Sequence, residues 1–509
     1  MAYAVVAPLV VLFLILYSRR KSRQYPLPPG PRKFPIVENL FQIPSGGFLW
    51  LDYAELCRKY ESDIIHLSAL GNSIIVLNSA KTASDLLEKR SSIYSSRPPT
   101  VMLGELMGWG STLIFRPNDD SWKSQRRIIN QALPPTDPKR FHPKQLSATH
   151  DLLRVLPHSD NLIRDFSRWA AAFIMDVTYG LDAAEAQPYL PTAVAALDSM
   201  ATAGTPGAFY VDQIPILKYV PEWFPGADFK RKAREWSDLR VKMTETAFNV
   251  TKQRMAMGTA TQSLTLAALE QIDRTQDLTS QEDIIKKASV TAYGGGSDTI
   301  VAALGSFILN MLMNPEIQIK AHEQLEKVLG PGDLPSFSDE PLLPYITAIT
   351  QEALRHNPVT PLAFPHELTQ DDIYEGYFLP KKSIIMPNVW SILHNEEDYP
   401  NAEVFNPSRF LDADGKMNSK VKDPANTAFG FGRRACPGKH IALGSLWIAV
   451  ASILTCYSIE PELDEHGKPV KPKAEWYPGP TLFNHPLPFK CRFVPRSRDV
   501  EASLGVSLI

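Results

Sequence analysis

The feature that most constrains this chain is one cysteine, Cys436, set in a glycine-rich loop directly before a long apolar segment. The loop reads Phe429-Gly-Phe-Gly-Arg-Arg-Ala-Cys-Pro-Gly438, and its glycines let the backbone turn tightly and approach a flat ligand. Residues 438–457 are apolar on nearly every side, which predicts a helix buried in a large core. Cys436 would lie at the N-terminus of that helix, where the dipole and the free N–H groups stabilise a metal-binding thiolate.

An isolated cysteine is more often a small buried apolar residue than a metal ligand, so the surrounding residues decide. The spacing Phe429-x-x-Gly432-x-Arg434-x-Cys436-x-Gly438 resembles in full the haem-binding loop of the cytochrome P-450 family, the haem-thiolate monooxygenases. The resemblance implies that haem b (iron protoporphyrin IX) is the cofactor and that Cys436 is the axial iron ligand. It also implies that Arg434 pairs with a haem propionate and that Phe429 contributes to cofactor binding.

Length and composition are consistent with one large domain. The chain has 509 residues and a net charge of −2, and its interior contains no flexible linker or repeat, so we expect a single globular domain and no nucleic-acid partner. Its cysteines form no Cys-x-x-Cys pair, which indicates neither a zinc site nor a disulfide framework. These are Cys57, Cys436, Cys456 and Cys491.

The N-terminus has the charge order of a membrane anchor. Residues 1–17 are uncharged and mostly apolar, and a basic cluster over residues 19–23 follows at once, whereas a cleavable signal peptide carries its charges first. We therefore predict a transmembrane anchor over residues 1–18, a basic and proline-rich hinge over 19–32 and a cytoplasmic domain over 33–509. The resemblance to microsomal members implies a single-pass protein of the endoplasmic reticulum membrane.

A short helix after the N-terminal region carries the next candidate site. Residues 64–67 and 73–77 read as strands of a small sheet, and residues 120–133 read as a helix. On that helix Trp122 and Arg126, at i and i+4, share one face, which by itself fits an ordinary surface helix. Beside the cysteine loop the pair resembles the family's second propionate clamp.

Residues 211–225 form a proline-interrupted segment with apolar side chains, including Leu217, Tyr219, Trp223 and Phe224. In membrane-bound family members the corresponding region enters the bilayer and forms the substrate entrance, so we expect these four side chains to be exposed. The segment is also similar to loops of fungal members, which implies a fungal source and a place in secondary metabolism.

Residues 283–314 read as one long helix with three successive glycines, Gly294 to Gly296, at its middle. Each glycine disfavours a helix by about 1 kcal/mol relative to alanine. A phosphate-binding loop would need a following Lys-Ser/Thr, which is absent. Gly295-Gly-Ser-Asp298-Thr299 resembles the oxygen-activating segment of the family, with glycine where alanine is commoner. The resemblance implies that Thr299 takes part in oxygen activation and that Asp298 relays protons.

Further downstream, Glu352 and Arg355 at i and i+3 can form an ion pair on a helix. Alone the pair is weak evidence, but Arg409 in Pro407-Ser-Arg-Phe410 resembles the arginine that completes a Glu-Arg-Arg cluster in the family. We expect these three residues to support the fold. His366 resembles a further propionate contact, although a satisfied surface histidine would look the same in sequence.

The fold class implied is mainly α with small peripheral β-sheets: the cytochrome P-450 fold as a single globular domain with an N-terminal membrane anchor. The reaction implied is the hydroxylation or epoxidation of a small hydrophobic substrate, such as a terpenoid or polyketide, with O2 and two electrons. No flavin or dinucleotide segment is recognisable, so a separate NADPH-dependent, flavin-containing cytochrome reductase is the expected partner. Basic residues near the cysteine loop could attract it: Lys123, Arg127, Arg433 and Lys439.

Two other readings of the sequence stay open. A haem-thiolate isomerase or dehydratase acting on a peroxide would not need oxygen activation, and the pair Asp298 and Thr299 counts against it. A non-catalytic haem sensor would need neither an apolar cavity nor an entrance loop.

Overall fold

Two of the most apolar stretches of the sequence form the centre of the fold. α19 (Lys439–Cys456) and α14 (Thr299–Met313) are buried along most of their length because neither has a polar face to give to solvent. Both contact α16 (Pro344–His356), and the three helices supply much of the largest hydrophobic core. The protein is represented by a computed structural model, which describes residues 25–205, 207–478, 482–497, 500 and 504.

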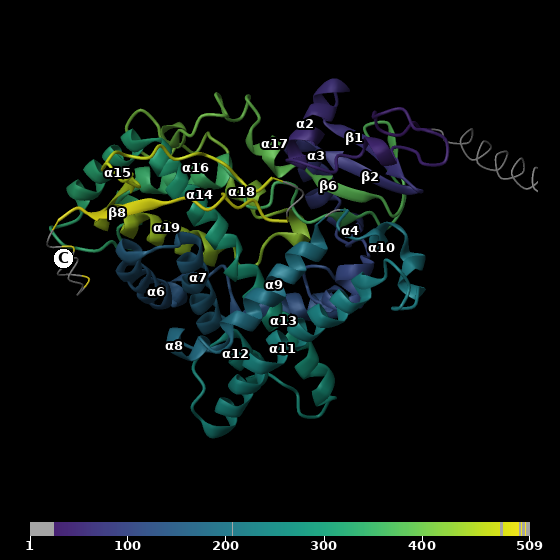
Figure 1. The fold of residues 1–509 in the computed structure, drawn as a ribbon, viewed down its shortest axis with the longest axis horizontal. Coiled ribbons are helices and arrows are strands. Elements are labelled where there is room, and N and C mark those ends of the chain that lie inside the picture. The colour runs from purple at the N-terminus through teal and green to yellow at the C-terminus, as the bar shows by residue number, and fades with distance from the viewer. Residues whose placement is uncertain (1–24, 206, 479–481, 498–499, 501–503, 505–509) are drawn as a thin grey trace, which may run out of the picture.

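The other helices surround this centre (Figure 1). The α-helices are α2 (Leu49–Lys59), α3 (Ala80–Ala83), α4 (Ser91–Tyr94), α5 (Asp120–Ala132), α6 (His142–Val155), α7 (Leu162–Tyr179), α8 (Ala183–Ala186), α9 (Leu190–Gly204), α10 (Tyr210–Gln213), α11 (Asp228–Met257), α12 (Leu264–Glu270), α13 (Leu278–Ser297), α15 (Pro315–Val328), α17 (Val389–Leu393) and α18 (Ala425–Ala428). Short 3₁₀ and π turns connect them: η1 (Leu40–Gln42), η2 (Ser84–Lys89), η3 (Val101–Leu106), η4 (Trp109–Ser111), η5 (Pro138–Phe141), η6 (Leu156–His158), η7 (Pro215–Tyr219), η8 (Glu340–Leu342), η9 (Pro407–Phe410) and η10 (Gly432–Arg434).

Three small sheets lie outside the helical centre. The four-stranded sheet has the order β1-β2-β6-β3, in which only the β2–β6 pair is parallel. The other two sheets are antiparallel pairs, β4–β5 and β7–β8. The strands are β1 (Ile64–Ala69), β2 (Asn72–Leu77), β3 (His366–Glu367), β4 (Asp372–Tyr374), β5 (Tyr377–Leu379), β6 (Ile384–Pro387), β7 (Tyr457–Pro461) and β8 (Cys491–Pro495).

The predicted long helix exists but differs at its start and in its middle. α13 begins at Leu278 and not at Asp283, because the Asp277 side chain accepts a 3.0 Å hydrogen bond from the Thr279 N–H and caps the helix. The helix is then interrupted at Asp298, where α13 ends and α14 follows from Thr299. Within the described part of the chain, this helical region and α19 are long and apolar enough to cross a membrane, and both are mostly buried as core.

The predicted anchor, residues 1–18, lies outside the described residues. The hinge is described from Tyr25, and it is extended as its prolines require. It is also attached to the sheets, since the Pro29 carbonyl accepts from the His66 N–H at 2.8 Å and the Pro26 carbonyl from the Phe378 N–H at 2.7 Å. Gly30 fits this contact because a Cβ there would lie 2.1 Å from the His66 oxygen.

The segment around η7 is apolar and exposed, with one correction to the prediction. Trp223 is 81% exposed and Phe224 is exposed, as predicted. Leu217 was expected beside them, but it is half-buried and packs against a core cluster, because the 3₁₀ turn directs it inward. Tyr219 is exposed as predicted, and Ile216, which was not part of the prediction, is exposed as well.

Candidate functional site

The cysteine loop folds into the tight turn that its glycines predict. Gly430 and Gly432 have φ values of 76° and 52°, a region that side chains disfavour. A Cβ on Gly432 would also lie 2.2 Å from the Leu87 carbonyl oxygen. The Cys436 N–H donates to the Phe429 carbonyl at 2.8 Å, which closes the loop, and Gly438 is the N-cap residue of α19.

The Cys436 side chain keeps accessible surface, although the surrounding protein still desolvates its sulfur. Burial raises the pKa of the Cys436 thiol, and the Gly438 N–H and the positive charges of Arg126 and Lys439 oppose this rise. The expectation that the helix N-terminus stabilises the thiolate is therefore incomplete, because desolvation outweighs the nearby donors. A metal cation at the sulfur would supply the missing stabilisation.

Arg434 lies on the same loop and is held by backbone carbonyls. Its guanidinium donates to the oxygens of Ser95, Leu113 and Arg116 at 2.6, 3.0 and 2.7 Å. Burial, together with the charges of Arg97 and Arg126, lowers the pKa of Arg434 to about 8. The shift shows that this positive charge is held in an unfavourable environment.

Arg97 completes this cationic group, and the sequence analysis did not identify it. It donates to the carbonyls of Ile114, Phe364 and Pro365 at 3.0, 2.7 and 2.8 Å, and burial lowers its pKa to about 9. Burial also lowers the pKa of Arg126. The charge of Asp119 partly opposes the lowering for Arg434, but no carboxylate among the described residues forms an ion pair with Arg97, Arg126 or Arg434.

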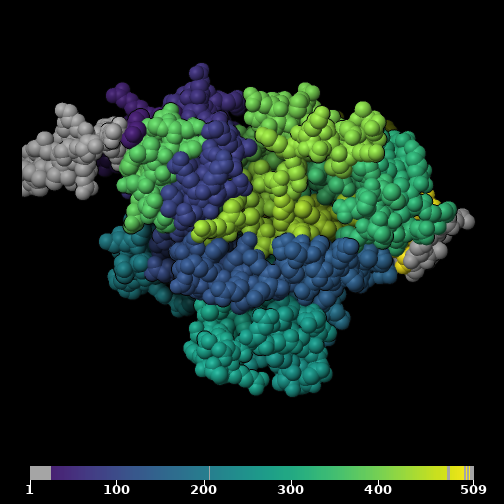
Figure 2. Space-filling view, turned by 180° about the vertical axis from the view of Figure 1, so that it is seen from behind, coloured from purple at the N-terminus to yellow at the C-terminus, as the bar shows by residue number. Residues whose placement is uncertain are grey.

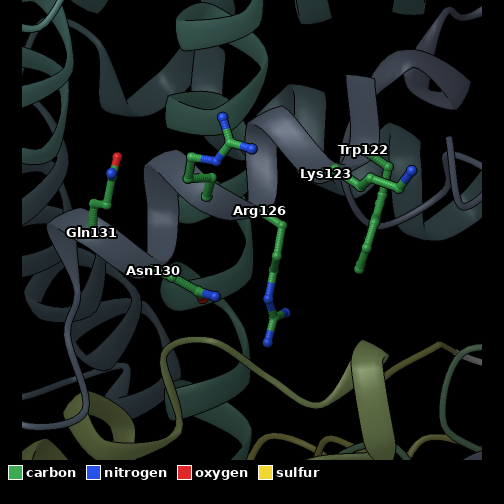
Figure 3. Close-up of a pocket in the computed structure, with 6 residues that line it drawn as sticks. Trp122, Lys123, Arg126, Asn130 and Gln131 are labelled. Carbon is green, nitrogen blue, oxygen red and sulfur yellow. The ribbon is translucent and has the colours of Figure 1, made fainter. Parts of the chain in front are cut away.

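Trp122 and Arg126 share one face of α5 as predicted, and a cavity of about 380 Å³ lies along the helix, lined by Trp122, Lys123, Arg126, Arg127, Asn130 and Gln131. Figure 3 shows Trp122 and Arg126 extending from α5 in the same direction. The Arg434 guanidinium lies 4.5 Å from the Trp122 ring centroid. The Trp122 Nε1–H is buried and has no acceptor within the described chain.

His366 is buried at the same end of the site, at the start of β3. Its Nδ1 donates to the Tyr94 carbonyl at 2.7 Å, since a carbonyl can only accept. Burial, and next the charge of Arg97, lowers the pKa of His366 well below its usual range. The imidazole is therefore neutral, with its Nε2 lone pair left as an acceptor. The sequence suggested that His366 contacts a haem propionate. Such a contact through Nε2 requires a proton on that nitrogen, and the negative charge of the propionate would favour this protonation.

The three glycines of α13 have separate surroundings. A Cβ on Gly296 would lie 2.7 Å from Ile174 of α7, and one on Gly294 would lie 3.1 Å from Leu197 of α9. A Cβ on Gly295 would meet no atom within 4 Å. Gly294 and Gly296 therefore permit close packing, whereas Gly295 borders open space.

At the helix interruption, the Thr299 hydroxyl donates to the Gly295 carbonyl at 2.9 Å. The Asp298 side chain points elsewhere, and its Oδ2 accepts from the His485 Nε2 at 3.2 Å. His485 comes from the C-terminal loop, and nothing in the sequence near it indicates this contact. The structure thus adds Arg97 and His485 to the residues that sequence reasoning found.

The predicted support cluster has the expected geometry. The Arg355 Nε and Nη2 donate to the two Glu352 carboxylate oxygens at 2.7 and 2.8 Å, and the Arg409 Nε donates to Oε1 at 3.2 Å. Asn406 adds its backbone N–H at 2.8 Å. Glu352 and Arg355 are fully buried, so this cluster belongs to the core.

Comparisons with known proteins agree with this site. A sequence model described as Cytochrome P450 matches residues 28–492. The chain belongs to the cytochrome P450 family. Cytochrome P450 monooxygenase 98 of Postia placenta is 57% identical over 499 residues, which cover 98% of this chain and 96% of the relative. Tryptamine 4-monooxygenase of Psilocybe cyanescens is 38% identical over 508 residues, 98% of each protein. Cytochrome P450 monooxygenase ple1 of Rhodocybe pseudopiperita is 38% identical over 489 residues, 95% of this chain and 92% of the relative.

This cytochrome P450 is therefore an oxidoreductase of the monooxygenase class with fungal relatives. Members of the family bind haem b through a cysteine thiolate, and they use O2, an organic substrate and a redox partner. The helix-rich domain with its small sheets fits the fold of the family. Of the three functions considered from the sequence, the comparisons support the monooxygenase.

Proposed function

We propose that this chain is a membrane-anchored monooxygenase in which Cys436 holds the iron of haem b. The observation that carries the proposal is the group of three guanidiniums that have no ion-pair partner among the described residues, at Arg97, Arg126 and Arg434, beside the unpaired Nε1–H of Trp122. Haem b carries two propionate carboxylates, and buried cations with an unused donor are what such carboxylates require. The accessible sulfur of Cys436 supplies the axial ligand in the same region.

The remaining proposed contacts follow from the geometry of the same site. The charge of Arg126 reaches the Cys436 sulfur as well as the arginine group, so one bound group could contact both. The Phe429 carbonyl accepts the hydrogen bond that closes the cysteine loop. His366 lies close enough to Arg97 and Arg434 for their charges to lower its pKa. Haem b, when bound, supplies the oxidising chemistry, and the thiolate favours O–O cleavage.

We further propose that Thr299 and Asp298 deliver protons to the reacting oxygen. Thr299 has a hydroxyl fixed at the helix interruption beside the open space at Gly295, and Asp298 has a carboxylate at 35% exposure that can exchange protons with water. Positioned proton donors of this kind contribute a factor of about 10²–10⁴ to a rate.

Substitution of Thr299 tests this role. In Thr299→Ala, NADPH consumption should continue while product falls and hydrogen peroxide rises, because the reducing equivalents no longer lead to oxygen insertion. The ratio of product to NADPH consumed is the measurement, with a second substrate as control for a substrate hydroxyl that replaces the threonine. An unchanged ratio with both substrates would remove Thr299 from the mechanism.

The proposed substrate is a small hydrophobic molecule that is hydroxylated or epoxidised, in fungal secondary metabolism. Phe364 lies 6.0 Å from Phe115 and 6.4 Å from Phe483 between ring centroids, which gives an aromatic wall near Arg97. A terpenoid or polyketide fits such a wall, and one relative is named for tryptamine. A panel of these three chemical classes, screened for the spin-state shift of the bound iron, would identify the class.

We propose a separate NADPH-dependent cytochrome reductase as the electron source, bound on the face that carries the cysteine loop. Lys123, Arg127 and Arg433 are exposed there, and Lys439 is half-buried. Figure 2 shows this face, where the yellow-green surface of the late chain lies above the blue band of the helices near residues 120–180. Charge reversal at Arg127 and Arg433 should slow reduction by the reductase and leave substrate binding unchanged.

We propose the domain division given by the sequence: an anchor over residues 1–18, a hinge over 19–32 and the catalytic domain over 33–509 on the cytoplasmic side of the endoplasmic reticulum. The exposed side chains of Ile216, Tyr219, Trp223 and Phe224 support a second membrane contact. Removal of residues 1–24 should give a folded haem protein that binds membranes less strongly. Loss of haem from the shortened chain would contradict this division.

The central experiment is the absorption spectrum of the reduced, carbon-monoxide-bound protein. Thiolate ligation should give the long-wavelength Soret band characteristic of the family, and Cys436→His should abolish that band. Retention of the band in Cys436→His would show that the ligand is another residue, and Cys456→Ser serves as the matched control.

A further inference from the structure

The carboxylate of Asp298 depends on one contact from a distant part of the chain. Asp298 lies between α13 and α14, and its backbone angles, φ −95° and ψ −32°, are helical. A residue with this backbone does not cap the following helix, and the Asp298 side chain makes no cap hydrogen bond. Among the described residues, its hydrogen-bond partner is the His485 Nε2 at 3.2 Å.

His485 is well placed to fix that carboxylate. Its ring is 19% exposed and packs edge to face on Phe483, with centroids 6.5 Å apart. Its backbone carbonyl accepts from the Tyr477 N–H at 3.1 Å. A carboxylate can only accept, so the His485 Nε2 carries the hydrogen.

A second carboxyl group interacts electrostatically with Asp298. Asp198 of α9 is close enough for the charge of Asp298 to raise its pKa, after burial, while His485 lowers it. Asp198, Asp298 and His485 therefore form one electrostatic group drawn from three separate segments. Without the imidazole, Asp298 would lose its hydrogen-bond donor among the described residues while the interaction with the Asp198 carboxyl group remained, and its side chain would be free to turn toward water.

We propose that His485 is a positioning residue for the monooxygenase reaction: it holds the Asp298 carboxylate in one orientation at the helix interruption between α13 and α14. This inference rests on the proposed proton-delivery role of Asp298. It assigns to the C-terminal loop a function in proton supply that acts through Asp298 and not through the substrate. A misplacement of about 1 Å in a catalytic group can lower a rate by up to about 100-fold.

The test is a double-mutant cycle on the full-length holoprotein. Asp298→Asn and His485→Phe should each lower reductase-driven product formation about tenfold, and the double variant should be no slower than Asp298→Asn alone. His485→Gln, whose amide Nε2 can donate to the same oxygen, should restore most of the rate. The solvent deuterium isotope effect on product formation should rise in both Asp298→Asn and His485→Phe.

The outcomes separate the proton-delivery role of Asp298 from the positioning role of His485. If Asp298→Asn leaves the rate and the isotope effect unchanged, the proposed proton-delivery role of Asp298 fails, and this inference fails with it. If Asp298→Asn is slow but His485→Phe is not, or if the two losses multiply in the double variant, the positioning role of His485 is wrong. The substrate-induced spin shift and the thermal midpoint are measured for every variant, so that lost binding or folding is recognised as a structural role, which also contradicts the inference.

Discussion

Two arginine clusters in this molecule use the same side chain for opposite purposes. Around Glu352, Arg355 and Arg409 share one carboxylate, and that cluster is closed. Around Arg434 lie the guanidiniums of Arg97 and Arg126; carbonyl oxygens accept from Arg97 and Arg434, and no carboxylate among the described residues forms an ion pair with any of the three. We call them the closed cluster and the open cluster.

The difference distinguishes buried charges that maintain the fold from buried charges that are available to bind a ligand. In the closed cluster every charge has a partner, so loss of one partner leaves another charge buried alone. In the open cluster the protein already bears the desolvation of three cations, as the lowered pKa values show. An anionic group that binds in the open cluster pairs with these cations, and the pairing offsets their desolvation free energy. The closed cluster has no unpaired charge with which to bind a ligand.

The largest expected effect breaks the closed cluster. Glu352→Ala leaves Arg355 buried without a partner and should reduce the free energy of unfolding by about 3–5 kcal/mol, in apoprotein and holoprotein alike. Denaturant titration measures the loss. Glu245→Ala, which removes a partly exposed partner of Lys286 at 2.6 Å, is the control and should cost about 1 kcal/mol or less. Equal losses of stability in Glu352→Ala and Glu245→Ala would show that the closed cluster contributes no more to the fold than a surface ion pair.

The next effect removes one cation from the open cluster. Arg126 makes no hydrogen bond to the described residues, so Arg126→Met should leave apoprotein stability unchanged or raise it, because a buried charge is lost. Haem affinity should fall by roughly 10- to 100-fold, the equivalent of about 1.5–3 kcal/mol for a charge-assisted hydrogen bond. Haem transfer to apomyoglobin measures the affinity. A destabilised apoprotein with normal haem affinity would be the reverse of this expectation.

A smaller effect concerns the unpaired indole. Trp122→Phe keeps a ring beside Arg434 and removes a buried donor that has no acceptor. Apoprotein stability should not fall, and haem affinity should drop about fivefold, near 1 kcal/mol for one neutral hydrogen bond. The same haem-transfer assay applies. Trp109→Phe, which also removes a buried indole donor without a partner, is the matched control and should leave haem affinity unchanged.

The smallest effect is a pH dependence from His366. Its pKa is lowered in the folded protein, so below about pH 6.5 the unfolded chain binds a proton that the folded apoprotein does not. The contribution of His366 to the free energy of unfolding is therefore fully present above pH 6.5 and is lost as the pH falls below this value. His366→Asn should flatten this loss between pH 6.5 and 5 in apoprotein unfolding. His322 and His394, whose pKa values burial lowers to about 4 and 3, have the same sign and stay intact.

Local spacing predicted those parts of the site whose residues lie on one element. The cysteine loop, the face of α5 with Trp122 and Arg126, and the Glu352–Arg355 pair are each written within ten residues, so turn chemistry and helical period were enough. Arg97 and His485 were missed because their partners come from distant segments. Arg97 binds Phe364 and His485 binds Asp298, and no periodicity relates such positions.

The interruption at Asp298 and the inward turn of Leu217 show a second limit. Glycine content indicated a weak point in the long helix, but the interruption lies at Asp298 and not at the glycines, two of which pack closely against Leu197 and Ile174. Leu217 and Ile216 are equally apolar in the sequence, and the 3₁₀ geometry of η7 alone decides which one faces the core.

The parallel β2–β6 pair has a consequence for how the chain is made. Ile74 pairs with Ile384, so β2 keeps an open hydrogen-bonding edge on the ribosome until the strand around residue 384 has emerged. Such an edge is prone to pair with other chains, and contacts this distant in sequence form slowly. The Ser95 and Leu113 carbonyls that hold Arg434 are synthesised early, yet their partner leaves the ribosome near the end of translation. Haem capture is therefore a late step in biogenesis, and a nascent chain stalled before residue 384 would expose its N-terminal sheet to chaperones while still unable to bind the cofactor.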